Sequence, residues 1–132
     1  MQCATVGLPQ SGNSPLRSDA LEATVTLKGQ GRGGRNTEFA LALALALEPI
    51  PATARVHALS AGSDGLDGRA GAAGAWLGPD SLAQARALGL KPLECLDDND
   101  SGSLFQHIGS LIHTGPTHTN INDFRAILIE AT

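Results

Sequence analysis

Residues 22–48, EATVTLKGQGRGGRNTEFALALALALE, decide the fold of this chain. The first seven alternate in character and include β-branched side chains, which predicts a strand. The next eight hold four glycines and two arginines, a density of glycine that no regular element tolerates. Alanine and leucine then dominate, and both are strong helix formers. With Asn36 as the N-cap and Pro49 and Pro51 as terminators, the stretch predicts a strand, a glycine-rich loop and a buried helix.

A second unit of the same kind follows. The sequence predicts strands at about 55–59 and 125–129, with a glycine-rich acidic loop at 60–74. Helices are predicted at about 80–88, 92–96 and 101–112, because Pro79, Pro92 and the DDNDS cluster provide starting signals. Strands alternating with helices predict an α/β fold, a layered domain with a mixed or mostly parallel sheet flanked by helices. We expect residues 1–18 to be a disordered or non-native segment and residues 19–132 to form the domain.

Composition excludes several classes of function. The 132 residues carry a formal net charge of −4, which argues against nucleic acid or an anionic membrane as the main partner. The longest apolar run, 39–47, is less than half of what a membrane-spanning helix needs. Residues 1–16 lack the features of an export signal, so we expect a cytoplasmic protein. Cys3 and Cys95 lie too far apart in sequence to indicate a zinc site.

The strongest local signal for chemistry is the GRGGRN motif at the start of the predicted helix. Glycines allow backbone amides to approach a ligand, and the amides of a helix N-terminus attract negative charge. A guanidinium can bind phosphate or carboxylate through two parallel hydrogen bonds. The motif therefore predicts an oxyanion site, and the alternative is a flexible surface loop with two solvated arginines. Its residues are Gly31, Arg32, Gly33, Gly34, Arg35 and Asn36.

Two further segments are candidates for the same site. Asp64 and Asp67, in SDGLDG, can bind a metal, position a substrate hydroxyl or accept its proton, although Asp-Gly pairs also simply make turns. The polar run 114–123, TGPTHTNIND, either binds a ligand or satisfies its own polar groups through turns.

Taken in order, GRGGRNTEFALALALAL, ALSAGSDGLDG, AGAWLGPDSLAQARALGL, DNDS and TGPTHTNINDFRAILI resemble the C-terminal MOFRL domain of glycerate kinases, a class often labelled hydroxypyruvate reductases. The resemblance covers about residues 22–129. It implies two α/β domains with the active site between them, and transfer of the γ-phosphoryl group of ATP to D-glycerate with Mg²⁺, typically giving 2-phosphoglycerate. The N-terminal kinase domain of that family does not match any part of this sequence.

The resemblance also implies roles for individual residues. It makes Arg35 the cationic catalytic residue, with Arg32 beside it, and it places Asp64 and Asp67 in the same cleft. The glycines and Asn36 of GRGGRN would bind substrate or phosphate, together with a further wall formed by Thr117, Asn120, Asn122 and Asp123. No metal ligand is assigned. The chain departs from the family where Arg69-Ala70-Gly71 replaces the usual Pro-Thr-Asp and where His118 replaces a glycine.

Three hypotheses follow. The first is the C-terminal domain of an ATP-dependent glycerate kinase, inactive without a partner domain or a separate chain that supplies it. The second is a non-catalytic module that binds an anionic metabolite or a partner chain. The third, hydroxypyruvate reduction, has little support in the residues, because no complete dinucleotide-binding βαβ unit is evident.

Overall fold

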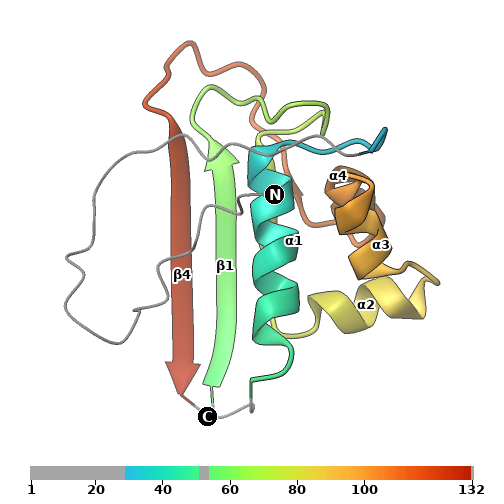
Figure 1. Ribbon diagram of the computed structural model, residues 1–132. Helices are drawn as coiled ribbons and strands as arrows, with labels where there is room; N and C mark the ends of the chain where they lie inside the picture. Colours follow the sequence, from blue (N-terminus) through green and yellow to red (C-terminus); the bar gives the residue numbers. More distant parts are fainter. Residues whose placement is uncertain (1–28, 51–53, 132) are drawn as a thin grey trace, which may run out of the picture.

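The computed structural model of the protein describes residues 29–50 and 54–131, and it contains four helices and four strands in that part of the chain (Figure 1). The predicted N-terminal segment 1–18 and the predicted strand at 22–28 lie outside the described residues. The elements, in chain order, are α1 (Arg35–Leu47), β1 (Ala54–Gly62), β2 (Gly74–Leu77), α2 (Ser81–Ala87), α3 (Pro92–Asp97), α4 (Ser101–His107), β3 (Leu111–Ile112) and β4 (Asp123–Ala131).

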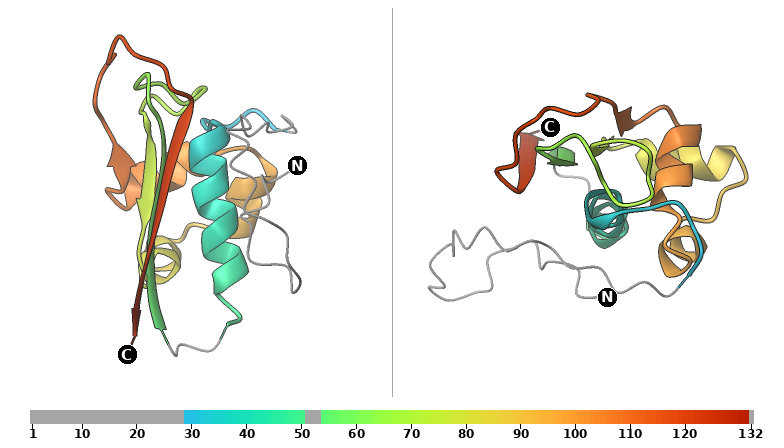
Figure 2. Two further views of the ribbon diagram at one scale, coloured as in Figure 1. Left: turned by 90° about the vertical axis from the view of Figure 1, so that its left-hand side faces the viewer. Right: turned by 90° about the horizontal axis from the view of Figure 1, so that it is seen from above.

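Helix α1 lies along one face of a four-stranded sheet. The strand order is β3-β2-β1-β4, so β4 forms one edge of the sheet. The left view of Figure 2 shows α1 on one side of β1 and β4. The short helices α2, α3 and α4 lie on the other side of α1 from β1 and β4 (Figure 1). The α/β class predicted from the sequence is thus confirmed.

The prediction of a mixed or mostly parallel sheet is wrong, because every strand pair in the described sheet is antiparallel. Parallel neighbours need a crossover connection, usually a helix. Here the connection from β1 to β2, residues 63–73, contains no helix, and β2 returns directly beside β1. Strand β4 also runs against β1, from Ala54 opposite Ala131 to Gly62 opposite Asp123.

The helix predictions are correct in place and differ at their ends. Helix α1 begins at Arg35, and its N-cap is Gly34 rather than the predicted Asn36. The last predicted helix stops at His107 instead of 112, because Leu111–Ile112 pairs with β2 as β3. No described helix is long and apolar enough to cross a membrane.

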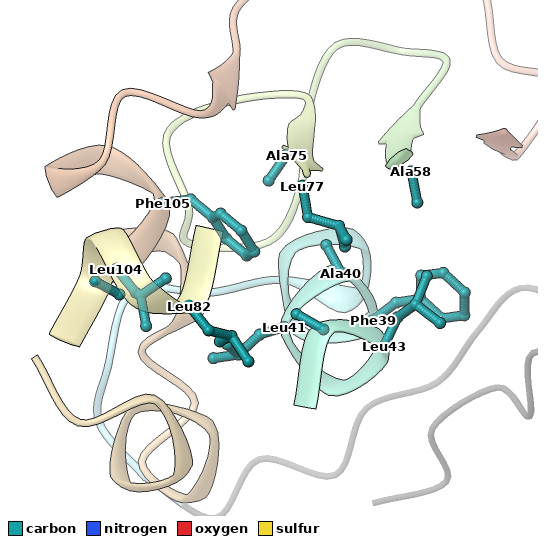
Figure 3. Packing of buried hydrophobic residues seen from close by; sticks show 12 residues of the cluster. Phe39, Ala40, Leu41, Leu43, Ala58, Ala75, Leu77, Leu82, Leu104 and Phe105 are labelled. Atoms are coloured by element: carbon teal, nitrogen blue, oxygen red, sulfur yellow. The ribbon is translucent and has the colours of Figure 1, made fainter. Parts of the chain in front are cut away.

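The hydrophobic core lies between α1 and the sheet and continues to α2 and α4 (Figure 3). Phe39, Leu41 and Leu43 of α1 are buried there, as the Ala/Leu sequence predicts. They pack with Ala75 and Leu77 of β2. Figure 1 shows the N-terminus of α1 beside the end of β1 and the start of β4.

Gly74 is required by the close pairing of β1 and β2. A Cβ at this position would lie 1.9 Å from the Ser60 carbonyl oxygen. We expect Gly74→Ala to lower the free energy of unfolding by about 1–3 kcal/mol or more, as overpacking does. Gly78→Ala is the control, because its Cβ would only meet the His57 ring at 3.5 Å. Urea unfolding of both variants checks this, and equal stability would show that the strands are not so closely paired.

Candidate functional site

The glycine-rich loop packs against the turn between α3 and α4. Its amides donate within the chain: Gly29 N to Asn99 Oδ1 at 2.9 Å, Gly31 N to the Asp98 carbonyl at 2.9 Å and Arg32 N to Asp100 Oδ1 at 2.8 Å. A Cβ on Gly31 would lie 2.4 Å from the Asp100 Cβ. The glycines therefore serve close packing, and these amides bind the protein itself rather than facing an open anion site.

The side chain of Arg32 lies towards α4. Its Nη1 is 3.5 Å from Gln106 Oε1, and its Nη2 would be 3.1 Å from a Cβ on Gly71. Arg35 instead reaches across to the start of β4. The two arginines that are close in the sequence therefore contact different parts of the fold.

Asp67 caps the N-terminus of α1 from the loop after β1. Its Oδ1 and Oδ2 accept from the backbone N–H groups of Asn36 and Thr37, each at 2.8 Å. The carboxylate is buried, and Gly34 has no room for a Cβ because Asp67 would lie 2.3 Å from it. Burial raises the pKa of Asp67, and the hydrogen bonds from Asn36 and Thr37 oppose that rise. Its contacts are those of a positioning group for the helix end.

Asn36, which the sequence offered as the helix cap, joins three segments with its side chain instead. Its Nδ2 donates to Asp67 Oδ1 at 3.2 Å and to Asp123 Oδ1 at 3.1 Å. Its Oδ1 accepts from Ser60 Oγ at 2.6 Å. The side chain is fully buried, so it cannot touch a solute. Asn36 thus ties the α1 start to β1, to the Asp-Gly loop and to β4.

Arg35 forms an ion pair with Asp123. Its Nε lies 2.9 and 2.8 Å from the two carboxylate oxygens of Asp123. The side chain of Asp123 is 6% exposed, whereas that of Arg35 is 30% exposed. A buried carboxylate, itself bound by Asn36, therefore holds a guanidinium that solvent can reach. A fixed, accessible cation of this kind can bind a phosphate or carboxylate.

Asp64 and the polar run 114–123 meet at the same end of the sheet. The Thr117 amide donates to the Asp64 carbonyl at 3.2 Å, and the Ile121 amide donates to Ser63 Oγ at 2.8 Å. Asn120 accepts from the Asn122 amide at 2.9 Å. Of the two readings of this run, turns that satisfy their own polar groups account for these contacts. Asp64 is half-buried, and its Oδ1 accepts from the Leu66 amide at 3.0 Å.

The backbone at His118 accounts for the glycine that the resemblance implies at this position. His118 has φ 58°, in the left-handed region that glycine adopts without strain. The glycine that usually stands at this position fits that conformation, and the histidine adopts it on an exposed loop.

Sequence reasoning missed three polar groups around the helix start. Ser60 and Arg125 are polar residues inside apolar strands, and this pattern in the sequence could have identified them as buried polar groups. Ser60 binds Asn36, and the Arg125 guanidinium lies 4.1 Å from the Phe39 ring centroid, with Nε 3.3 Å from Ser60 Oγ. The third is Glu38, which precedes the long apolar run.

Glu38 is a buried carboxyl group between α1 and α4. Its Oε1 accepts from Ser101 Oγ at 2.8 Å, and its Oε2 has no hydrogen-bond partner in the described structure. The pKa of Glu38 is raised to about 7, mainly by burial; the Ser101 hydrogen bonds oppose the rise, and the nearby charges of Asp67 and Asp100 add to it. The folded protein therefore binds a proton at Glu38 that the unfolded chain releases near pH 4.5.

This proton makes stability depend on pH. Because the folded pKa is above the unfolded one, the contribution of neutral Glu38 is fully present below about pH 4.5 and is lost as the pH rises to about 7. A difference of this size corresponds to about 3 kcal/mol. Glu38→Gln is expected to remove that part of the decline, leaving the smaller effect of Asp67 with the same sign. Urea unfolding between pH 4.5 and 8 measures it, and parallel pH profiles for both proteins would contradict it.

Substitution of Asn36 is expected to lower the free energy of unfolding more than substitution of the exposed Asn120. Asn36→Ala removes one side-chain hydrogen bond from each of Asp67, Asp123 and Ser60 in a buried position, so we expect a loss of about 1–3 kcal/mol. Asn120→Ala, on the exposed loop, is expected to cost less than about 1 kcal/mol. Thermal unfolding of the two variants gives the comparison, and equal losses would count against the Asn36 network.

The implied Mg²⁺ does not fit the carboxylates that lie near Arg35. Asp67 and Asp123 both accept from N–H donors of the chain. The described residues also contain no group of three or more histidine, cysteine, aspartate or glutamate side chains arranged to hold a metal. We therefore assign Asp67 and Asp123 to these N–H donors rather than to a metal.

Comparisons with known proteins agree with the resemblance. A family model described as the MOFRL family matches residues 20–123. An Agrobacterium vitis protein named "Putative hydroxypyruvate reductase" is 47% identical over 131 residues, covering 98% of this chain and 33% of its own. The D-glycerate 2-kinase of Thermotoga maritima is 44% identical over 102 residues, covering 77% of this chain and 24% of its own.

The solved structures give the same picture. The crystal structure of a glycerate kinase from Thermotoga maritima matches with a TM-score of 0.71 and 41% identity, over 83% of this chain and 25% of that one. A Pyrococcus horikoshii protein matches with a TM-score of 0.73 and 28% identity, over 83% and 24% of the two chains. The chain thus spans a quarter to a third of these relatives.

Proposed function

The chain belongs to the MOFRL family, and we propose that it is the C-terminal part of an ATP-dependent glycerate kinase. The reaction is transfer of the γ-phosphoryl group of ATP to a hydroxyl of D-glycerate, giving a phosphoglycerate, typically the 2-phosphate. The similarity to glycerate kinases supports phosphoryl transfer to glycerate as the type of reaction. The observation that supports this site is the Arg35 guanidinium, fixed by Asp123 and accessible to solvent.

Phosphoryl transfer mainly requires positive charge and correct placement of the reacting groups. We assign Arg35 to contact the phosphate oxygens, where its charge stabilises the transition state. Asp123 orients the guanidinium through Nε, and Asn36 and Asp67 act as positioning residues behind it. Of the two Asp-Gly carboxylates, the half-buried Asp64 is the one we assign to the substrate hydroxyl. A cytoplasmic location is part of the same proposal.

The rest of the cleft, with the groups that bind ATP and Mg²⁺, belongs in this proposal to the part of the kinase that these 132 residues do not match. This chain is therefore expected to show no kinase activity on its own. A suitable test protein is a chimera in which this chain replaces the matched quarter of the Thermotoga maritima D-glycerate 2-kinase.

Arg35 is the residue whose loss should matter most in that chimera. With ATP, Mg²⁺ and D-glycerate, we expect Arg35→Ala to lower kcat by a factor on the order of 10³ or more, as loss of a transition-state cation does. Arg86→Ala is the control and should leave kcat nearly unchanged, because the Arg86 side chain is exposed on α2 and pairs with Glu48. Chromatographic assay of phosphoglycerate gives the rates.

Three results would revise the proposal. An unchanged kcat for Arg35→Ala would make Arg35 a structural residue. Turnover by the isolated chain would remove the need for a partner domain. A folded chimera that binds phosphate without turnover would favour the second hypothesis, a non-catalytic anion-binding module.

The names of the Agrobacterium vitis relatives are the observation in favour of hydroxypyruvate reduction. Dinucleotide-binding folds use parallel strands joined by helices, whereas the described sheet is antiparallel. Oxidation of NADH or NADPH by the chimera with hydroxypyruvate would establish this alternative.

A further inference from the structure

The sheet has two different faces. Ala58, Ser60, Ala75 and Leu77 point towards α1, since they are buried in the core or bound to Asn36. Side chains alternate between faces along a strand, so their neighbours point the other way. The pairing register aligns these neighbours in one surface, which we call the far face: Leu59, Trp76, Phe124, Ala126 and Leu128.

The far face is apolar and open. Trp76, Phe124 and Leu128 are 45%, 58% and 59% exposed. Antiparallel sheets that face water usually alternate apolar residues inside with polar residues outside. Here most of the outward residues are apolar as well, and the polar side chains of this face, Arg55, His57 and Glu130, lie towards the end of the β1–β4 pair away from Asp123. Depletion of charge at the centre of a patch is typical of a protein interface.

The relatives show how much chain is available to cover this face. This chain matches a quarter of the solved Thermotoga maritima glycerate kinase, so three quarters of that protein lie outside the match. The far face also adjoins the candidate site, because Phe124 directly follows Asp123, the residue that binds Arg35. The side chains of Asp123 and Phe124 point to opposite faces of the sheet, so a body seated on the far face would reach the Arg35 site around the end of the sheet where β4 begins.

We propose that the far face is the surface on which the remaining part of the glycerate kinase docks against this chain. The inference rests on the proposed function for the identity of the partner. It assigns the partner to one side of the sheet, opposite α1, and leaves the exposed residues of α2 and α3 outside the interface.

Hydroxyl-radical footprinting read by mass spectrometry tests this residue by residue. The full chain and the Thermotoga maritima chimera are labelled under the same conditions. We expect labelling of Trp76, Phe124 and Leu128 to fall at least about three-fold in the chimera, because their side chains lose contact with water. Leu88 and Leu93, which are 58% and 62% exposed near α2 and on α3, are matched controls and should stay unchanged.

The other outcomes overturn the proposal. Unchanged labelling of the far face in a folded chimera would show that nothing docks there. Protection of Leu88 and Leu93 instead would place the partner on the helices. Protection of the far face in the isolated chain that grows with its concentration would identify a second copy as the occupant.

A second measurement covers a chimera that does not fold. This chain is co-expressed with the unmatched three quarters of the Thermotoga maritima protein as a separate polypeptide. The wild-type chain and Leu88→Lys should co-purify with it, and Leu128→Lys should not. Absence of wild-type co-purification, or equal recovery of Leu128→Lys, overturns the proposal.

The failures of surface and function can be told apart. Turnover by a chimera whose far face stays labelled would contradict the docking surface and support the kinase function. Protection of the far face in a chimera without turnover would support the docking surface and contradict the kinase function.

Discussion

The buried N-terminus of α1 is the constraint on which this structure depends. A helix that starts inside the protein leaves amides that must be satisfied without water. Asp67 satisfies two of them from another loop, and Asn36 then bonds to Asp67, Asp123 and Ser60. One helix end thereby fixes the positions of three segments that are far apart in the sequence.

The candidate site is a consequence of that arrangement. Once Asn36 places Asp123, the carboxylate is in reach of the neighbouring residue, Arg35, and holds its Nε. Residues 35 and 36 thus have different roles. Asn36 is buried and makes structural contacts, while Arg35 remains partly exposed. A cation with a set orientation loses little freedom when an anion binds, which favours phosphate recognition.

Sequence reasoning was most successful where the signal is local. The Ala/Leu run predicts α1, and prolines and aspartates mark the starts of the short helices, because propensity and capping act within a few residues. The antiparallel sheet was not predictable in this way, since β2 has only four residues and β3 two, too short to show a period. The capping role of the Asp67 carboxylate was missed because Asp67 lies 31 residues from Asn36. The motifs named Arg35 and Asp123 as site residues, yet nothing local joins residues 88 apart.

In the proposed function, this helix end holds Arg35 in an orientation that suits a phosphate group. Proton–nitrogen NMR of the arginine Nε–H groups in the full chain, with 2-phosphoglycerate added stepwise, measures it most directly. We expect a slowly exchanging Arg35 signal that shifts in a saturable way, while the Arg86 signal stays in place. An Arg35 signal that exchanges as fast as that of a free arginine, or that ignores the ligand, would contradict it.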